Sequence, residues 1–311
     1  MKTIMITGCA GFIGSHTVEN FLSAGYRVVG VDSMTYAASR DNMKSFIDDI
    51  TFVEEDICNT QKIKELVEDN KVSWIINFAA ETHVDNSIEN CSNFIHSNVN
   101  GVQSLLEVCK STGCSVLQIS TDEVYGSVEE NTSLEEDRLD PRNPYSATKA
   151  AAEHLIAAYH NTHKISYKMV RMSNNFGPRQ HSEKFLPTIL RSLMSGKKIP
   201  IYGNGSNIRD WLYVKDCANL IRGILENGKL NNVYNLTYNN EMTNIEIVKC
   251  VLGILDKDLD SSIEFVEDRP GHDFRYAINN SKMLEVCDKD ITGMVDAIEE
   301  TILHYKNRRI V

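Results

Sequence analysis

Short apolar runs alternate with longer amphipathic stretches along the first half of the chain. Residues 3–7 form a β-branched run that ends at Gly8, which is typical of a strand buried on both faces. Apolar residues then recur at helical spacing over 13–24, and Gly25 is a suitable helix stop. A second strand is expected over 27–31. Together these segments predict a strand, a helix and a strand in succession.

The same alternation continues further along the chain. Strands are expected at 51–53, 74–78, 116–120 and 167–171, with periodic helical stretches between most of them. This order predicts an α/β fold of the Rossmann type, a doubly wound parallel sheet with helices on both faces. Ligands of such sheets bind beyond the carboxyl ends of the strands. Gly8, Asp32, Ala79 and Thr121 stand at those ends, so we expect them to line a site.

After residue 172 the pattern changes to loops rich in Asn, Gly and Pro, expected at 173–179 and 199–210, with shorter helices. We therefore predict a Rossmann domain over 1–172 and a smaller lobe over 173–311, some segments of which return to the first domain. The chain has no internal repeat or flexible linker, so a cleft is expected between the two parts.

Composition narrows the class of protein. The 311 residues are 42% hydrophobic and 24% charged, as in ordinary globular proteins. The net charge of −11 argues against a nucleic-acid partner, although a local group of cations could still bind a small anion.

The eight cysteines form no C-x-x-C pair and have no His at zinc-finger spacing, so we expect reduced thiols and no metal site. The sequence has no signal-type leader and no apolar stretch long enough for a bilayer. A cytoplasmic location without a membrane partner is therefore expected.

Three glycines, Gly8, Gly11 and Gly14, lie between the first strand and the first helix. Glycine lets the backbone turn tightly there and approach a pyrophosphate at the helix N-terminus. Asp32 follows 18 residues after Gly14, where its carboxylate can accept hydrogen bonds from a ribose and would repel a 2′-phosphate. NAD is therefore favoured over NADP. A structural glycine turn with a surface Asp is the alternative.

Tyr145 and Lys149 follow Pro144 and are four residues apart, which places both on one helical face. The ammonium is expected to lower the phenol pKa, and a phenolate could take a proton from a sugar hydroxyl as hydride leaves for nicotinamide. An exposed Tyr and Lys that merely share a helix are the alternative.

Thr121, Asp122 and Glu123 directly follow the strand expected at 116–120, at its carboxyl end. Two carboxyl groups in a partly desolvated cleft repel each other, which raises one pKa and leaves one acid and one base. The alternative is a solvated acidic turn.

Taken together, these motifs resemble the extended short-chain dehydrogenase/reductases, and among them the dTDP-glucose 4,6-dehydratases. The resemblance covers nearly the whole chain. The resemblance rests on the segments 7–15, 32–36, 79–85, 120–126, 145–149, 173–175, 208–211 and 268–273.

The resemblance implies a nucleotide-sugar dehydratase. Tyr145 would deprotonate the C4 hydroxyl while NAD accepts the C4 hydride. Glu123 would remove the C5 proton, and Asp122 would protonate the departing C6 hydroxyl. Return of the hydride to C6 gives the 4-keto-6-deoxy sugar and water.

The resemblance also implies binding residues. The cofactor set is Gly8, Gly11, Phe12, Ile13, Gly14, Asp32, Ser33, Met34, Thr35, Asp56, Ile57, Ala79, Ala80, Ser97, Tyr145, Lys149 and Asn174. The nucleotide-sugar set is Thr82, Thr121, Asn175, Lys184, Pro200, Tyr202, Arg209, Asn244, Arg269 and His272. The cations Lys184, Arg209 and Arg269 suit a diphosphate, although each could be an ordinary surface residue. Pro200 and Tyr202 offer a surface for a base.

The chain departs from the family pattern near the substrate. It is shorter than typical members, the stretch from Glu123 to Tyr145 is compact, Asn86 replaces an Arg, and a Gly-Trp-x-Pro segment is missing after Cys287. The base (dTDP or UDP) and the sugar (glucose or an N-acetylated relative) therefore stay open. A nucleotide-sugar 4-epimerase is the runner-up, followed by a non-catalytic NAD-binding protein. Helices at 98–110 and 147–159 match those of a dimer contact in relatives, so a homodimer is expected.

Overall fold

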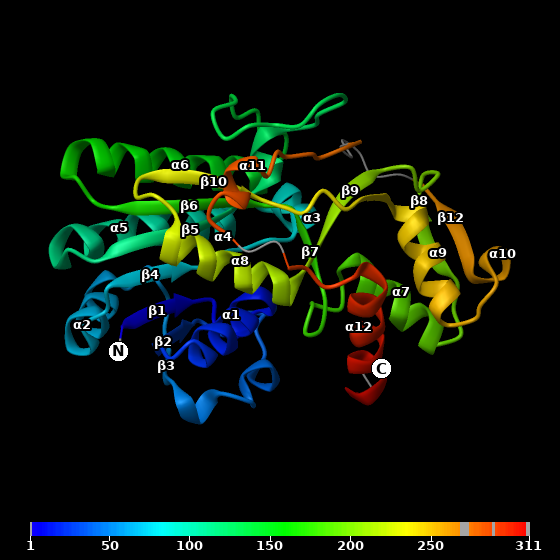
Figure 1. Cartoon of the computed structure of the whole chain (residues 1–311), viewed down its shortest axis with the longest axis horizontal. Helices are drawn as coiled ribbons and strands as arrows, with labels where there is room; N and C mark the ends of the chain where they lie inside the picture. Colours follow the sequence, from blue (N-terminus) through cyan, green and yellow to red (C-terminus); the bar gives the residue numbers. More distant parts are fainter. Residues whose placement is uncertain (1, 268–273, 288–289, 309–311) are drawn as a thin grey trace.

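A seven-stranded parallel sheet forms the centre of the computed structural model, which describes residues 2–267, 274–287 and 290–308. The strand order is β10-β6-β5-β4-β1-β2-β3 (Figure 1), and every neighbouring pair is parallel. The strands are β1 (Thr3–Thr7), β2 (Arg27–Asp32), β3 (Thr51–Glu54), β4 (Trp74–Asn77), β5 (Ser115–Thr121), β6 (Tyr167–Met172) and β10 (Asn232–Leu236). The predicted Rossmann-type sheet is confirmed.

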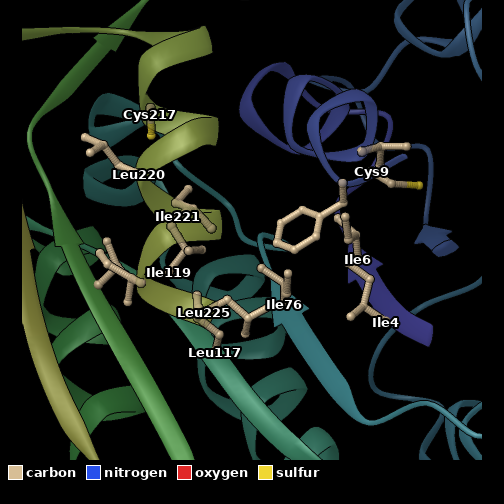
Figure 2. Close-up of a cluster of buried hydrophobic side chains, with 14 of the residues drawn as sticks. Ile4, Ile6, Cys9, Ile76, Leu117, Ile119, Cys217, Leu220, Ile221 and Leu225 are labelled. Carbon is tan, nitrogen blue, oxygen red and sulfur yellow. The ribbon is translucent and has the colours of Figure 1, made fainter. Parts of the chain in front are cut away.

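Helices cover both faces of this sheet. One layer contains α1 (Phe12–Ser23) packed against α8 (Val214–Asn227), and the other contains α2 (Thr60–Asn70), α5 (Gly101–Thr112) and α6 (Pro144–His163). Side chains of β1 alternate between the two layers: Ile4 and Ile6 belong to one hydrophobic cluster and Met5 to the other. In Figure 2 Leu117 and Ile119 of β5 lie near Leu220 and other apolar side chains of α8. β1 is buried on both faces, as its continuous apolar run predicted, whereas the edge strand β3 is exposed or half-buried.

A smaller lobe is built from short strands and helices with a separate apolar cluster. Its elements are β7 (Asn174–Phe176), α7 (Phe185–Met194), β8 (Ile199–Tyr202), β9 (Ile208–Tyr213), β11 (Glu241–Thr243), α9 (Asn244–Ile254), α10 (Leu259–Ser262), β12 (Ile263–Val266) and α12 (Met294–Arg308). One sheet has the order β11-β9-β7, and β12 pairs with β8. The small lobe therefore has its own core.

The prediction of loops at 173–179 and 199–210 was wrong in part, because β7, β8 and the start of β9 lie there. These strands are short, and their partners are remote in sequence: β8 pairs with β12, and β9 with β11. Pro200 is tolerated in β8 because that strand pairs on one side only.

Two segments after residue 172 belong to the large sheet and its cover. β10 pairs with β6, and α8 packs on α1. The boundary at residue 172 itself stays a prediction.

The remaining helical elements are short. They are η1 (Arg40–Met43), η2 (Ile47–Asp49), α3 (Val84–Glu89), α4 (Ser92–Phe94), the π-helix η3 (Ile95–Asn100), η4 (Asp122–Tyr125) and α11 (Ser281–Leu284). Within the described ranges, every helix is too short or too polar to cross a bilayer. Cys9, Cys109, Cys114 and Cys217 are buried thiols of the core.

Candidate active site

A cleft of about 290 Å³ lies at the carboxyl ends of the central strands. The four positions expected there meet in its lining: Gly8 after β1, Asp32 at the end of β2, Ala79 after β4 and Thr121 at the end of β5. The segment from the end of β6 to the start of α7 supplies the side that faces them. This is the place where doubly wound sheets bind dinucleotides.

The glycine turn is shaped by two positions that admit no side chain. Gly8 has a φ of +67°, and a Cβ there would lie 2.8 Å from the backbone nitrogen of Ala79. A Cβ on Gly14 would lie 2.1 Å from the carbonyl oxygen of Gly8. Because neither glycine has a Cβ, the N-terminus of α1 packs directly against the turn, where its N–H groups can face a pyrophosphate. The turn therefore fits a dinucleotide.

Asp32 is buried, and two backbone hydrogen bonds fix its carboxylate. The Ala10 N–H donates to Oδ2 at 2.9 Å, and the Met34 N–H donates to Oδ1 at 2.8 Å. Burial raises the pKa of this carboxyl above its usual value. Each oxygen retains an accepting lone pair that suits a ribose hydroxyl.

The cleft collects all but one of the predicted cofactor residues. Gly8, Gly11, Phe12, Ile13, Gly14, Asp32, Ser33, Thr35, Asp56, Ile57, Ala79, Ala80, Ser97, Tyr145, Lys149 and Asn174 line it. The exception is Met34, which is not in the lining because its side chain packs against the hydrophobic cluster of α1 and α8. Met34 contributes its N–H to Asp32 instead.

The five predicted catalytic residues, Thr121, Asp122, Glu123, Tyr145 and Lys149, line the same cleft. The chain turns from β5 into η4 at Thr121, where the Glu123 N–H donates to the Thr121 hydroxyl at 3.3 Å.

A cap at the start of α6 joins the two motifs. Asn143 caps this helix by accepting from the Ser146 N–H at 2.8 Å, and Pro144 occupies the first turn. The Asn143 amide also donates to Glu123 Oε2 at 3.1 Å. The cap of the helix that carries Tyr145 thus holds the Glu123 carboxylate.

Asp122 is suited to carry a proton. Its side chain is buried, and Oδ2 has no hydrogen-bond partner. Burial raises its pKa to about 8, with repulsion from Glu123 and Asp210 adding to the effect. At neutral pH this carboxyl is therefore mainly protonated, as expected for one member of a closely spaced acidic pair.

Tyr145 and Lys149 are both buried. Burial raises the pKa of Tyr145, and so do the charges of Glu123 and Asp122, whereas a hydrogen bond with Thr121 opposes the rise. Burial lowers the pKa of Lys149 to about 8.

The expected lowering of the Tyr145 pKa by Lys149 is not found in the chain alone. The Lys149 ammonium donates to the Ile119 carbonyl at 2.6 Å, and burial together with the charge of Glu123 raises the phenol pKa.

The predicted substrate residues divide into three groups. Thr82, Thr121, Asn175 and Lys184 line the cleft, and Pro200, Tyr202, Arg209 and Asn244 are outside its lining. Arg269 and His272 lie outside the described residues.

Arg209 nevertheless acts on the site, because its charge opposes the rise in the Asp122 pKa. Its guanidinium donates to the carbonyls of Ile208 and Phe274 and stacks 4.6 Å from the Tyr276 ring centroid.

Several lining residues were not predicted from the sequence. Ser173, Gln180 and His181 contribute to the cleft, and Ser173 Oγ and Gln180 Oε1 are buried atoms with no hydrogen-bond partner. Such atoms are available to a ligand. The polar cluster just before Lys184 was the signal that could have found two of them.

Comparisons with known proteins agree with this geometry. The GDP-mannose 4,6 dehydratase family matches residues 5–288. Low-salt glycan biosynthesis protein Agl12 of Haloferax volcanii is 42% identical, covering 97% of this chain and 98% of that protein. A dTDP-glucose 4,6-dehydratase of Xanthomonas campestris is 38% identical, covering 91% and 87% of the two chains.

A solved structure is also similar. DesIV, a dTDP-glucose 4,6-dehydratase from Streptomyces venezuelae with NAD and TYD bound, superposes with a TM-score of 0.94 at 35% identity, covering 99% of this chain and 98% of that one. Together with the cleft, these matches show that the chain belongs to the GDP-mannose 4,6 dehydratase family and is an NAD-dependent nucleotide-sugar 4,6-dehydratase.

Proposed function

We propose that the chain converts dTDP-glucose or UDP-glucose into the corresponding 4-keto-6-deoxyglucose nucleotide and water, with Thr121, Asp122, Glu123, Tyr145 and Lys149 as the catalytic residues. The observation that carries this proposal is the buried Asp122, with its pKa raised to about 8, beside Glu123 in the cleft that Tyr145 lines. A dehydration needs a proton donor and a proton acceptor at neighbouring carbons, and these two carboxyl groups supply both.

The cofactor is proposed to lie along the glycine turn. Gly8, Gly11 and Gly14 would hold its pyrophosphate, and Asp32 its adenosine ribose. NAD supplies the hydride acceptor for C4 and later the hydride donor for C6. On this proposal residues 1–172 mainly bind the cofactor, and 173–311 mainly bind the sugar nucleotide.

Tyr145 is proposed to take the proton of the C4 hydroxyl. Its raised pKa means that the phenol needs nearby positive charge to ionise, and Lys149 lies one helical turn further along α6. The Lys149 pKa of about 8 leaves the ammonium mainly charged at neutral pH.

Elimination is proposed to use the two carboxyl groups. A ketone at C4 acidifies the proton on C5, which the Glu123 carboxylate removes. The Asn143 amide holds that carboxylate at 3.1 Å. Asp122 gives its proton to the C6 hydroxyl, which leaves as water.

Glu123→Gln tests these roles, with the exposed Glu136→Gln as a matched control. The Glu123 variant is expected to retain C4 oxidation but to release no product lighter by one water, measured by mass spectrometry with dTDP-glucose and UDP-glucose. Unchanged dehydration would remove Glu123 from its role. A product of unchanged mass with inverted C4 from the unmodified protein would favour the 4-epimerase instead.

We also propose a cytoplasmic homodimer that pairs α5 and α6 of two copies. The two helices pack against each other within one chain, where the Tyr159 hydroxyl donates to Glu107 at 2.6 Å. A monomeric mass by light scattering at micromolar concentration would contradict the dimer.

A further inference from the structure

Three side chains with metal-binding chemistry meet beside the cleft, which one of them, Asp56, also lines. Asp56 and Cys58 follow β3, and His96 lies in the π-helix η3. The His96 Nε2 atom is 2.9 Å from Asp56 Oδ2, and the Cys58 sulfur is 3.9 Å from His96 Nδ1. One ligand atom from each residue can be chosen so that all three lie within 4.8 Å of one another. No metal site was expected from the cysteine spacing, and that spacing does not indicate this group because Cys58 and His96 are remote in sequence.

The backbone holds the three residues in place. The Cys58 N–H donates to Asp56 Oδ1 at 2.8 Å, and the Cys58 thiol donates to the His96 carbonyl at 3.5 Å. The π-helix is a rare element that recurs at functional sites. Here it brings His96 to the turn after β3 and Ser97 into the cleft. The turn after β3 therefore positions Asp56 and Cys58, and η3 positions His96 against them.

Thiolate, imidazole and carboxylate together are ligands for zinc and the neighbouring transition metals. At bond lengths of about 2.0 to 2.3 Å, tetrahedral ligand atoms lie about 3.5 Å apart. The contacts of 2.9 and 3.9 Å use different nitrogens of the His96 ring, so an ion takes only one of them. The chosen ligand atoms, which lie within 4.8 Å of one another, then move slightly inward to reach that spacing. The His96 and Asp56 side chains are 52% and 45% exposed, so they have room to adjust and leave a fourth position open to water.

We propose that Asp56, Cys58 and His96 bind one transition-metal ion of the zinc class. The Cys58 sulfur loses its proton to solvent as the sulfur–metal bond forms, so each bound ion releases one proton and no electron is transferred. The site goes beyond the dehydratase reaction, because β3 is four strands from β5 in the sheet order and Thr121 ends β5.

The ion and NAD share a residue. Asp56 belongs to the cluster and also lines the cleft. A metal ion bound to its carboxylate therefore makes that carboxylate unavailable to the dinucleotide. Metal binding therefore weakens NAD binding, and NAD weakens metal binding by the same factor.

Equilibrium dialysis of the full chain with zinc, after chelator treatment, tests the site. One ion is expected per chain, and Cys58→Ser and His96→Gln are each expected to weaken binding at least about tenfold. Cys250→Ser and His163→Gln are matched controls outside the cluster and should bind zinc normally. Equal zinc binding by the Cys58 and unmodified proteins would overturn the proposal.

Two further measurements separate the proposal from unfolding and from loose surface binding. Cobalt substitution is expected to give a thiolate-to-metal absorption band that is missing only in the Cys58 variant, whose circular dichroism should match the unmodified protein. A zinc affinity that is the same with and without saturating NAD would overturn the shared use of Asp56.

Discussion

A buried ion pair behind the catalytic residues gives the sharpest stability prediction. Arg171 of β6 and Glu153 of α6 have side chains only 7% and 4% exposed, and they meet at 2.7 Å. The Arg171 guanidinium also donates to the Tyr125 hydroxyl at 2.6 Å and to the Glu135 carbonyl at 3.0 Å. The pair thus connects α6 to the segment that follows β5.

Arg171→Met removes the positive partner and leaves the Glu153 charge buried. Breaking a buried pair from one side costs about 3 to 5 kcal/mol in the free energy of unfolding. The double variant Arg171→Met/Glu153→Leu removes both charges and should recover part of that loss. It should remain below the unmodified protein by about 1 to 3 kcal/mol, because Tyr125 and the Glu135 carbonyl each lose a hydrogen bond.

Urea unfolding followed by circular dichroism measures these differences. Arg40→Met is a matched control, because Arg40 pairs with Glu54 at the surface with side chains 66% and 52% exposed. Its expected cost is below about 1 kcal/mol. An Arg171→Met variant that loses no more stability than Arg40→Met, or a double variant no more stable than the single one, would contradict this prediction.

Three other predictions concern the site. Dehydration should slow as pH rises through about 8, because Asp122 has its raised pKa there and loses the proton it donates; a kcat profile that stays flat to higher pH would contradict this. Gly14→Ala should abolish NAD retention, measured by the absorbance of the released cofactor, because the new Cβ would lie 2.1 Å from the Gly8 carbonyl oxygen. Asn143→Ala should cost about 1 kcal/mol of unfolding free energy and lower kcat more than KM changes, since it removes both the helix cap and the contact to Glu123. The expected loss of stability without any change in kcat would restrict Asn143 to capping the helix.

Six of the seven strands of the central sheet could be predicted because each carries its own signal, whereas β10 was not predicted. A short β-branched run followed by Gly8 or Asp32 identifies a strand and its carboxyl end without reference to any partner. Since parallel strands align these ends, the meeting of Gly8, Asp32, Ala79 and Thr121 followed from the local pattern.

Features that depend on remote partners could not be predicted in this way. β8 is a strand because β12 pairs with it, and a run of four residues containing Pro200 has no signal of its own. The side chain of Lys149 donates to the Ile119 carbonyl, which the helical spacing with Tyr145 does not indicate. The partly buried side chain of Met34 packs against the core although its neighbours line the cleft.

The cap of α6 has a consequence for how the connection before it can vary. The Asn143 amide holds Glu123, and the Asp140 N–H donates to the Val124 carbonyl at 2.9 Å. Both ends of the loop between Val124 and Asn143 are therefore anchored beside the end of β5. Residues can be inserted at its exposed tip, 129–131, without changing the separation of the Glu123 carboxylate and the Tyr145 phenol. Ser133 and Glu135 are buried and do not share this freedom, so divergence is confined to the tip while the chemistry stays constant.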